Sequence, residues 1–164
     1  MKALVITMLL LSVAATQAQT RMLSSPSTTT VDDKEAALQV IDKLFAAMKA
    51  KDGKALSALF VKDGQLVAVE LPQTGSGPST TQLVTADGFA KMIGESKGGD
   101  EFIEQMKNPE VKLFGDIALV YGRYTFHLGE MLRHCGTNSF HLLRTADGWK
   151  IANGASTIEF KCGN

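Results

Sequence analysis

The sequence contains few residues of the kinds that build metal and redox centres, with two cysteines and three histidines among its 164 residues. No histidine lies at a metal-binding spacing from another histidine or from a carboxylate, so we predict no metal site and no cofactor. Long runs of one charge are also missing. The 17 basic and 17 acidic residues are spread along the chain, which argues against nucleic acid or an anionic membrane as a partner.

No apolar stretch is long enough to cross a bilayer, which takes roughly 20 residues. The apolar run over residues 3–11 follows Lys2 and leads into small residues, a pattern typical of a secretory signal peptide. Thr16 and Ala18 fit the small-residue positions just before a cleavage site. We therefore interpret residues 1–18 as a signal peptide and expect the mature protein to be exported, either periplasmic or secreted. A frayed or core N-terminal helix is the alternative.

The rest of the chain is predicted to be a single domain preceded by a leader. Residues 19–30 are rich in Ser and Thr and have no apolar period, so we expect them to be flexible. Residues 31–164 are predicted to form the domain. Its balanced charge gives the mature form no reason to associate with a membrane.

Helices are predicted in the first half of this domain. Asp32 and Glu35 have the spacing of an N-cap and capping box. Apolar residues then recur at three- and four-residue steps, which is typical of an amphipathic helix, and Gly53 is expected to end it in a left-handed conformation. A short second helix is expected around residues 56–60 and a third over Ala86–Ser96.

The second half is rich in strand-forming residues. Helices first and antiparallel strands afterwards indicate an α+β fold. The strand over Phe102–Phe114 is expected to be interrupted at Asn108-Pro109, because proline cannot donate to a strand ladder. The predicted strands are Gln65–Leu71, Thr80–Thr85, Phe102–Phe114, Ile117–Leu132, Ser139–Thr145 and Trp149–Phe160.

The two cysteines, Cys135 and Cys162, are interpreted as a disulfide, because an even number of cysteines in an exported protein commonly pairs. The Asp147-Gly148 turn is expected to close a hairpin in which Thr145 faces Lys150 or a near neighbour. Extending this register places Cys162 level with about position 133, beside a turn that holds Cys135. Two free thiols are the alternative.

Short motifs follow one another through the C-terminal third: Asn108-Pro109-Glu110-Val111, Gly115-Asp116-Ile117-Ala118-Leu119-Val120, Tyr124-x-Phe126, Gly129, His134-Cys135-Gly136, Phe140-x-Leu142-x-Arg144 and Gly148-Trp149-Lys150-Ile151. In this order they resemble the nuclear-transport-factor-2-like superfamily, in particular its lumazine-binding-protein branch. The two opening helices and the segment Phe60-Val61-Lys62-Asp63-Gly64 are similar to that superfamily too. The resemblance covers nearly the whole mature chain.

The resemblance implies a cone. A strongly curved antiparallel sheet would pack against three helices from the N-terminal half, the roll of cystatin-like proteins, and leave a cavity open at one end. It also implies a tendency to dimerise through the sheet, so we expect a homodimer. It implies no single activity, because the superfamily contains isomerases, dehydratases, cyclases and binding domains.

Ketosteroid isomerase, a member of this superfamily, has a carboxylate base that would fall near Ala68 here. Glu70 is the only carboxylate in that strand, and we expect it at the rim. The departure counts against an isomerase. A dehydratase-like site would need a paired His and Asp acting through a water molecule.

Of the three histidines, His134 is the candidate for chemistry. Counting alternate residues back along an unbroken strand places it on the same face as Phe126 and Tyr124. His134 and Tyr124 are therefore candidate acid and base groups. The alternative is that His134 is a hydrogen-bonded turn residue beside the disulfide.

Two functions follow from these patterns. The first is an exported module that binds a small, largely apolar or aromatic ligand. The second is an isomerase- or dehydratase-type enzyme that uses His134 and Tyr124. A cavity in which His134 and a second titratable group lie within about 3 Å of a common point would favour the enzyme. An oligomerisation domain without a ligand is a third possibility. The candidate ligand-binding residues are Tyr124, Phe126, His134, Phe140, Trp149 and Asn153.

Overall fold

The computed structural model describes residues 30–163 and has an α+β fold, as the sequence predicts. Six strands form one sheet in the order β2-β1-β6-β5-β4-β3. The predicted signal peptide and leader lie outside the described residues. The elements are α1 (Thr30–Lys49), α2 (Gly53–Ala58), β1 (Phe60–Glu70), β2 (Thr80–Thr85), α3 (Ala86–Gly94), β3 (Phe102–Phe114), β4 (Ile117–Leu128), β5 (Met131–Thr145) and β6 (Gly148–Ile158).

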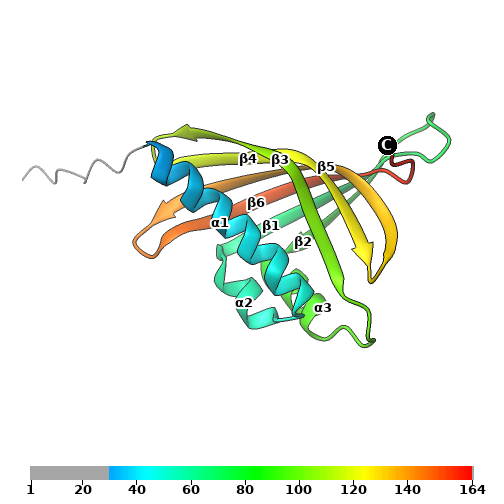
Figure 1. The fold of residues 1–164 in the computed structure, drawn as a ribbon, viewed down its shortest axis with the longest axis horizontal. Helices are drawn as coiled ribbons and strands as arrows, with labels where there is room; N and C mark the ends of the chain where they lie inside the picture. The colour runs from blue at the N-terminus through cyan, green and yellow to red at the C-terminus, as the bar shows by residue number, and fades with distance from the viewer. Residues whose placement is uncertain (1–29, 164) are drawn as a thin grey trace, which may run out of the picture.

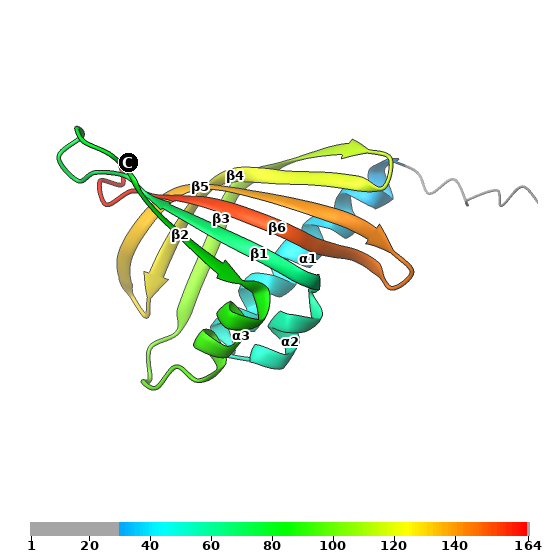
Figure 2. The same ribbon diagram turned by 180° about the vertical axis from the view of Figure 1, so that it is seen from behind.

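The sheet is strongly curved, and the three helices lie on its concave side (Figure 1). Helix α1 runs obliquely across the sheet, while α2 and α3 lie together near its C-terminal end, as the view from behind also shows (Figure 2). One feature departs from the predicted antiparallel sheet: β1 pairs with β6 in parallel, and every other pair is antiparallel. None of the helices between residues 30 and 163 is both long and apolar enough to cross a membrane.

The core forms where α1 meets the middle of the sheet. The predicted apolar face of α1 is buried at residues such as Val40, Ile41 and Leu44. Burying one such side chain contributes about 1.5–3 kcal/mol relative to leaving it exposed. The strands supply fully buried partners, among them Val120, Leu142 and Ile151.

Both expected caps of the first helix are wrong. Helix α1 begins at Thr30, so Asp32 lies inside its first turn. At the other end Lys51, with a φ of 54°, takes the left-handed conformation expected for Gly53. Gly53 instead begins α2, whose N-cap is Asp52, and the Asp52 carboxylate accepts a hydrogen bond from the Ala55 amide.

Strands β2 and β3 have the predicted bounds, and β3 is interrupted where Pro109 was expected to disturb it. The register against β4 shifts between Lys107 and Glu110, and Asn108 has a φ of 47°. The prediction for the next hairpin is wrong. Its turn lies at Gly129, with a φ of 58°, and not at residues 134–136, because pairing with β4 extends β5 back to Met131.

The predicted disulfide between Cys135 and Cys162 is present, with 5.8 Å between the two Cα atoms. Cys135 lies within β5 and not in a turn, and it forms an isolated bridge with Glu159 just beyond β6. In the chain-entropy model a bridge of this span stabilises the fold by about 3.5 kcal/mol. It ties the end of the chain to the sheet.

A bulge in β6 decides which of its residues face the helices. His141 pairs with Asn153 and Leu142 with Ile151, so Ala152 is the extra residue on β6. An extra residue reverses the alternation of faces beyond it. Ile151 is therefore buried and Asn153 exposed on the opposite face, although they are two residues apart.

Candidate functional site

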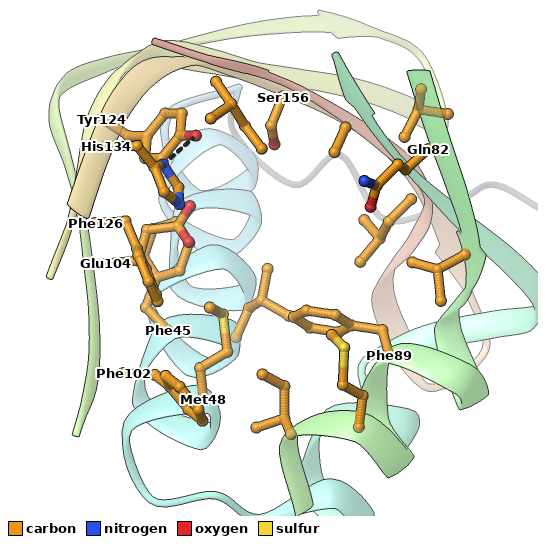
Figure 3. Close-up of a pocket in the computed structure, with 18 of the residues that line it drawn as sticks. Phe45, Met48, Gln82, Phe89, Phe102, Glu104, Tyr124, Phe126, His134 and Ser156 are labelled. Carbon is orange, nitrogen blue, oxygen red and sulfur yellow. Dashed lines mark hydrogen bonds between the residues drawn. The ribbon is translucent and has the colours of Figure 1, made fainter. Parts of the chain in front are cut away.

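A cavity of about 700 Å³ lies between the concave face of the sheet and helices α1 and α3 (Figure 3). This volume is within the range of sites for small organic molecules. Most of the lining is apolar, and none of the described residues that line it is Lys or Arg. The lining residues are Leu44, Phe45, Met48, Leu66, Val67, Ala68, Gln82, Leu83, Val84, Phe89, Met92, Ile93, Ser96, Phe102, Glu104, Tyr124, Phe126, His134, Phe140, Ser156 and Ile158.

The sheet gathers polar groups on one side of this cavity. Glu104 of β3 is the register partner of Phe126 of β4, and Phe126 is the partner of His134 of β5. The Phe126 and His134 rings stack, with 4.8 Å between their centroids and 18° between their planes. Tyr124 points inward beside them, and Ser156 lies on β6. We call Glu104, Tyr124, His134 and Ser156 the polar wall.

Tyr124 fixes the orientation of His134. The Tyr124 hydroxyl donates to the backbone carbonyl of Thr157 at 2.9 Å and lies 3.1 Å from Nδ1 of His134. Because the hydroxyl has one proton, His134 must supply the hydrogen of the second bond from Nδ1. In neutral His134 this leaves Nε2 as a hydrogen-bond acceptor.

Gly136 makes room for this arrangement. It pairs with Tyr124 across β4 and β5. A Cβ atom at residue 136 would overlap the Thr157 carbonyl that accepts from Tyr124. The missing side chain therefore lets the end of β6 approach β5 and brings this carbonyl within reach of the tyrosine.

A second network holds Glu104. The fully buried Asn138 donates from Nδ2 to Oε1 of Glu104 at 2.6 Å, and its Oδ1 accepts from the Ser156 hydroxyl at 2.6 Å. Burial raises the pKa of Glu104 to about 7, although the Asn138 hydrogen bond acts in the opposite direction. Glu104 can therefore hold or release a proton near neutral pH.

The other two titratable groups of the polar wall are shifted toward their neutral forms. Burial lowers the pKa of His134, and the positive charge of Arg133 lowers it further. Burial also raises the pKa of Tyr124 above its ordinary value, with added contributions from the charges of Glu104 and Glu159. Tyr124 thus keeps its proton and acts through the position of His134.

A smaller cavity of about 370 Å³ lies between α1 and β3. Phe45 and Glu104 line both cavities and so form the partition between them. Across residues 30–163, no three His, Cys, Asp or Glu side chains are grouped closely enough to hold a metal ion.

The family of the chain follows from its sequence as well as its fold. A model of the SnoaL-like domain matches residues 29–154. The chain belongs to the SnoaL-like domain family. This family lies within the nuclear-transport-factor-2-like superfamily, so that resemblance is confirmed, whereas the lumazine-binding branch is not what the family model identifies.

Solved structures show the same fold at low sequence identity. A nuclear-transport-factor-2-like protein with a cystatin-like fold from Novosphingobium aromaticivorans is 19% identical, with a TM-score of 0.62 over 78% of this chain and 82% of the other. A candidate dehydratase from Streptomyces avermitilis is also 19% identical, with a TM-score of 0.58 over 79% and 98%.

A third similar structure is a candidate aromatic ring hydroxylase from Novosphingobium aromaticivorans. It is 19% identical, with a TM-score of 0.56 over 83% of this chain and 94% of the other. No curated protein matches the chain at a significant level. The similarities therefore establish the fold of this SnoaL-like domain and leave its activity unassigned.

The structure brings four of the six predicted ligand-binding residues of the SnoaL-like domain to the cavity: Tyr124, Phe126, His134 and Phe140. His134 reaches it for a different reason than expected. It does not continue the strand of Tyr124 and Phe126 but lies opposite Phe126 on the neighbouring strand.

Trp149 and Asn153 do not line the cavity. Trp149 is 6% exposed in the core at the other end of β6, where the Arg144 guanidinium lies 4.4 Å from the centre of its ring and also pairs with Asp33 of α1. Asn153 faces outward because of the bulge at Ala152, and its side chain contacts His141.

Sequence reasoning missed Glu104. The signal was present in the alternation of Phe102, Glu104 and Met106 along β3, which places one carboxylate among inward-facing apolar residues. Ala68, where the isomerase comparison would place a base, lines the cavity without a polar group, and Glu70 does not line it.

We predict that Glu104→Gln changes how stability depends on pH. Between pH 4.5 and about 7 the unfolded chain releases the Glu104 proton while the folded protein keeps it, so the free energy of unfolding of the wild type falls as pH rises. Glutamine cannot ionise. The free energy of unfolding is measured by urea titration for both proteins. The value of the variant minus that of the wild type should increase by about 3 kcal/mol as pH rises across this window.

The exposed Glu130→Gln variant in the β4–β5 turn is the matched control and should follow the wild type. The lowered pKa of His134 makes stability fall as pH drops, the opposite direction, but this contribution is common to all three proteins and cancels in the differences. A constant difference between Glu104→Gln and wild type from pH 4.5 to 7.5 would contradict the assignment.

Proposed function

We propose that this SnoaL-like domain is an exported module that binds a small, largely apolar ligand inside the cone. The observation that carries the proposal is the 700 Å³ cavity, whose lining is mostly apolar with a few polar groups, among them the polar wall and, across the cavity from it, Gln82 (Figure 3). Such a combination is typical of small-molecule sites, where apolar surface supplies affinity and a few polar groups fix orientation.

Aromatic side chains support a ring-containing ligand. Phe45, Phe89, Phe102, Phe126 and Phe140 all line the cavity. Phe102 and Phe126 are stacked, with 6.2 Å between their centroids. Flat apolar molecules could pack against these faces with little loss of side-chain freedom, since the rings already pack against one another.

Filling the cavity should abolish binding. Ala68 lines it from β1, so Ala68→Trp would occupy the space that a ligand needs. The matched control is Ala155→Trp, the same change on the exposed face of the neighbouring strand β6. We expect wild type and Ala155→Trp to bind phenanthrene, a neutral fused-ring hydrocarbon, in equilibrium dialysis, and Ala68→Trp to lose at least about 90% of the bound fraction.

Equal phenanthrene binding by Ala68→Trp and Ala155→Trp would place the hydrocarbon outside the cone. Absence of binding by the wild type as well would contradict the proposed function. Circular dichroism of both variants must match the wild type, so that loss of binding is not loss of fold.

A second candidate function is proton transfer, as in an isomerase or dehydratase. The observation that favours it is that His134 and Glu104 lie on the same wall of the cavity. Nε2 of His134 can accept a proton, and Glu104 can supply one near neutral pH. The acid/base pair would therefore be His134 and Glu104, and not the predicted pair of His134 and Tyr124, because the tyrosine keeps its proton. Catalysis needs both groups at one reacting atom, whereas binding needs only the cavity, so binding is the first proposal.

Export, dimerisation and membership of the lumazine-binding branch complete the proposal. The disulfide is consistent with an oxidising compartment, and the order of the C-terminal motifs supports the branch. Exposed apolar residues support a dimer through the sheet. Phe114, Ile117 and Leu143 are 62%, 44% and 37% exposed on neighbouring strands of its outer face.

One measurement tests both export and dimerisation. Native mass spectrometry of protein recovered from the periplasm or medium of expressing cells should give twice the mass of a chain that starts at Gln19. A monomer mass would contradict the dimer, and a chain that still begins at Met1 would contradict export.

A further inference from the structure

The hydrogen-bonding inventory of the polar wall restricts which polar group a ligand can carry. The side chains that form it come from four strands, and each has defined bonds within the protein. The hydrogen-bond donors and acceptors that those bonds leave unused determine which ligand group can bind to the polar wall. This reasoning rests on the proposed function, because it concerns the ligand of the same cavity.

His134 presents an acceptor. Its Nδ1 is engaged with the Tyr124 hydroxyl, whose own proton goes to the Thr157 carbonyl. The hydrogen bond of His134 within residues 30–163 uses Nδ1 and leaves Nε2 without a partner there. A ligand atom beside Nε2 must therefore donate a hydrogen bond.

Glu104 presents the complementary position. Its Oε1 accepts from Asn138, and this hydrogen bond leaves Oε2 without a partner in the described part of the chain. No hydrogen bond or ion pair joins Glu104 to His134 within residues 30–163, although both lie on the same side of the cavity (Figure 3). When Glu104 holds its proton, Oε2 can donate to a ligand oxygen.

Charge excludes the common anionic ligands. The described cavity lining contains a carboxyl group and no Lys or Arg side chain. A carboxylate or phosphate would lose its hydration without a cation to replace it, and it would face Glu104. The site therefore lacks what an anion needs.

We propose that the ligand is a neutral apolar ring compound that carries a hydroxyl group, an alcohol or phenol, placed at His134 and Glu104. A hydroxyl donates one hydrogen bond and accepts others, so it can donate to Nε2 of His134 and accept from Glu104. A ketone cannot donate to His134, and a plain hydrocarbon leaves both polar groups without a partner.

Three probes with one ring system test this inference: phenanthrene, 9-phenanthrol and phenanthrene-9-carboxylate. Their dissociation constants are measured by equilibrium dialysis at pH 6, where Glu104 is mostly protonated. We expect the phenol to bind about tenfold more tightly than the hydrocarbon, the size of one good neutral hydrogen bond. The carboxylate should bind more weakly than the hydrocarbon by about tenfold or more.

Two variants assign the preference to the named atoms. His134→Phe keeps a ring against Phe126 but has no acceptor, so it should bind phenol and hydrocarbon about equally. His141→Phe is the matched control, since His141 lies on the exposed face of the same strand. It should keep the preference. Glu104→Gln keeps a donor and cannot ionise, so it should keep the preference for phenol at pH 6. At pH 8, where Glu104 of the wild type is mostly ionised, the variant should bind the carboxylate more tightly than wild type does.

The outcomes separate this inference from the function on which it rests. If phenanthrene binds but the phenol binds no more tightly, or if the carboxylate binds best, the hydroxyl assignment is wrong and the apolar cavity stands. A preference that survives in His134→Phe also overturns the assignment. If none of the three probes binds the wild type, the proposed function fails and the assignment fails with it.

Discussion

The hydroxyl of Tyr124 has one proton and two neighbours, and the chemistry of the cavity depends on where that proton goes. The Thr157 carbonyl can only accept, so the tyrosine hydroxyl donates its hydrogen bond there. The tyrosine oxygen is left to accept a hydrogen bond from His134. The rest follows from this constraint. His134 is held in one orientation and one tautomer, its outer nitrogen becomes an acceptor, and burial keeps the ring neutral by lowering its pKa.

The backbone makes this geometry possible. Strand β6 pairs with β1 on one side and β5 on the other, so it lies inside the sheet and joins its two halves. The bulge at Ala152 turns the second half of β6 so that Ser156 and Ile158 face the cavity. Thr157 lies near the end of β6, and it can approach residue 136 closely because Gly136 has no side chain. The disulfide fixes the segment that follows. Stability and site geometry thus depend on the same few residues.

The sequence predicts much of this arrangement where the pattern is local. The apolar period of α1, the bounds of β2 and β3 and the break at Pro109 are all properties of short segments. The disulfide was predicted from a register that was off by two residues at the turn and by one near the cysteines, and it is confirmed because a pair of cysteines tolerates that error. The resemblance supplied the curved sheet and the cavity.

The remaining features depend on contacts between distant segments. The turn at Gly129 was missed because pairing along β4 holds β5 in place through His134 and Cys135. Asn153 was assigned to the wrong face because a bulge leaves no mark in the alternation of side chains. Glu104 was overlooked although alternation groups it with Phe102 and Met106, because the sequence does not show which face of this strand points inward. Its raised pKa is a property of the assembled cavity and of no segment alone.

The most direct test of this account is the tautomer of His134, read from its side-chain nitrogen chemical shifts in ¹⁵N-labelled protein at pH 7.5. His134→Phe identifies the signals. The account predicts a neutral ring with a proton on Nδ1 and none on Nε2. A neutral ring protonated on Nε2 would show that the Tyr124 proton goes to the histidine, and it would contradict the acceptor on which the ligand assignment depends.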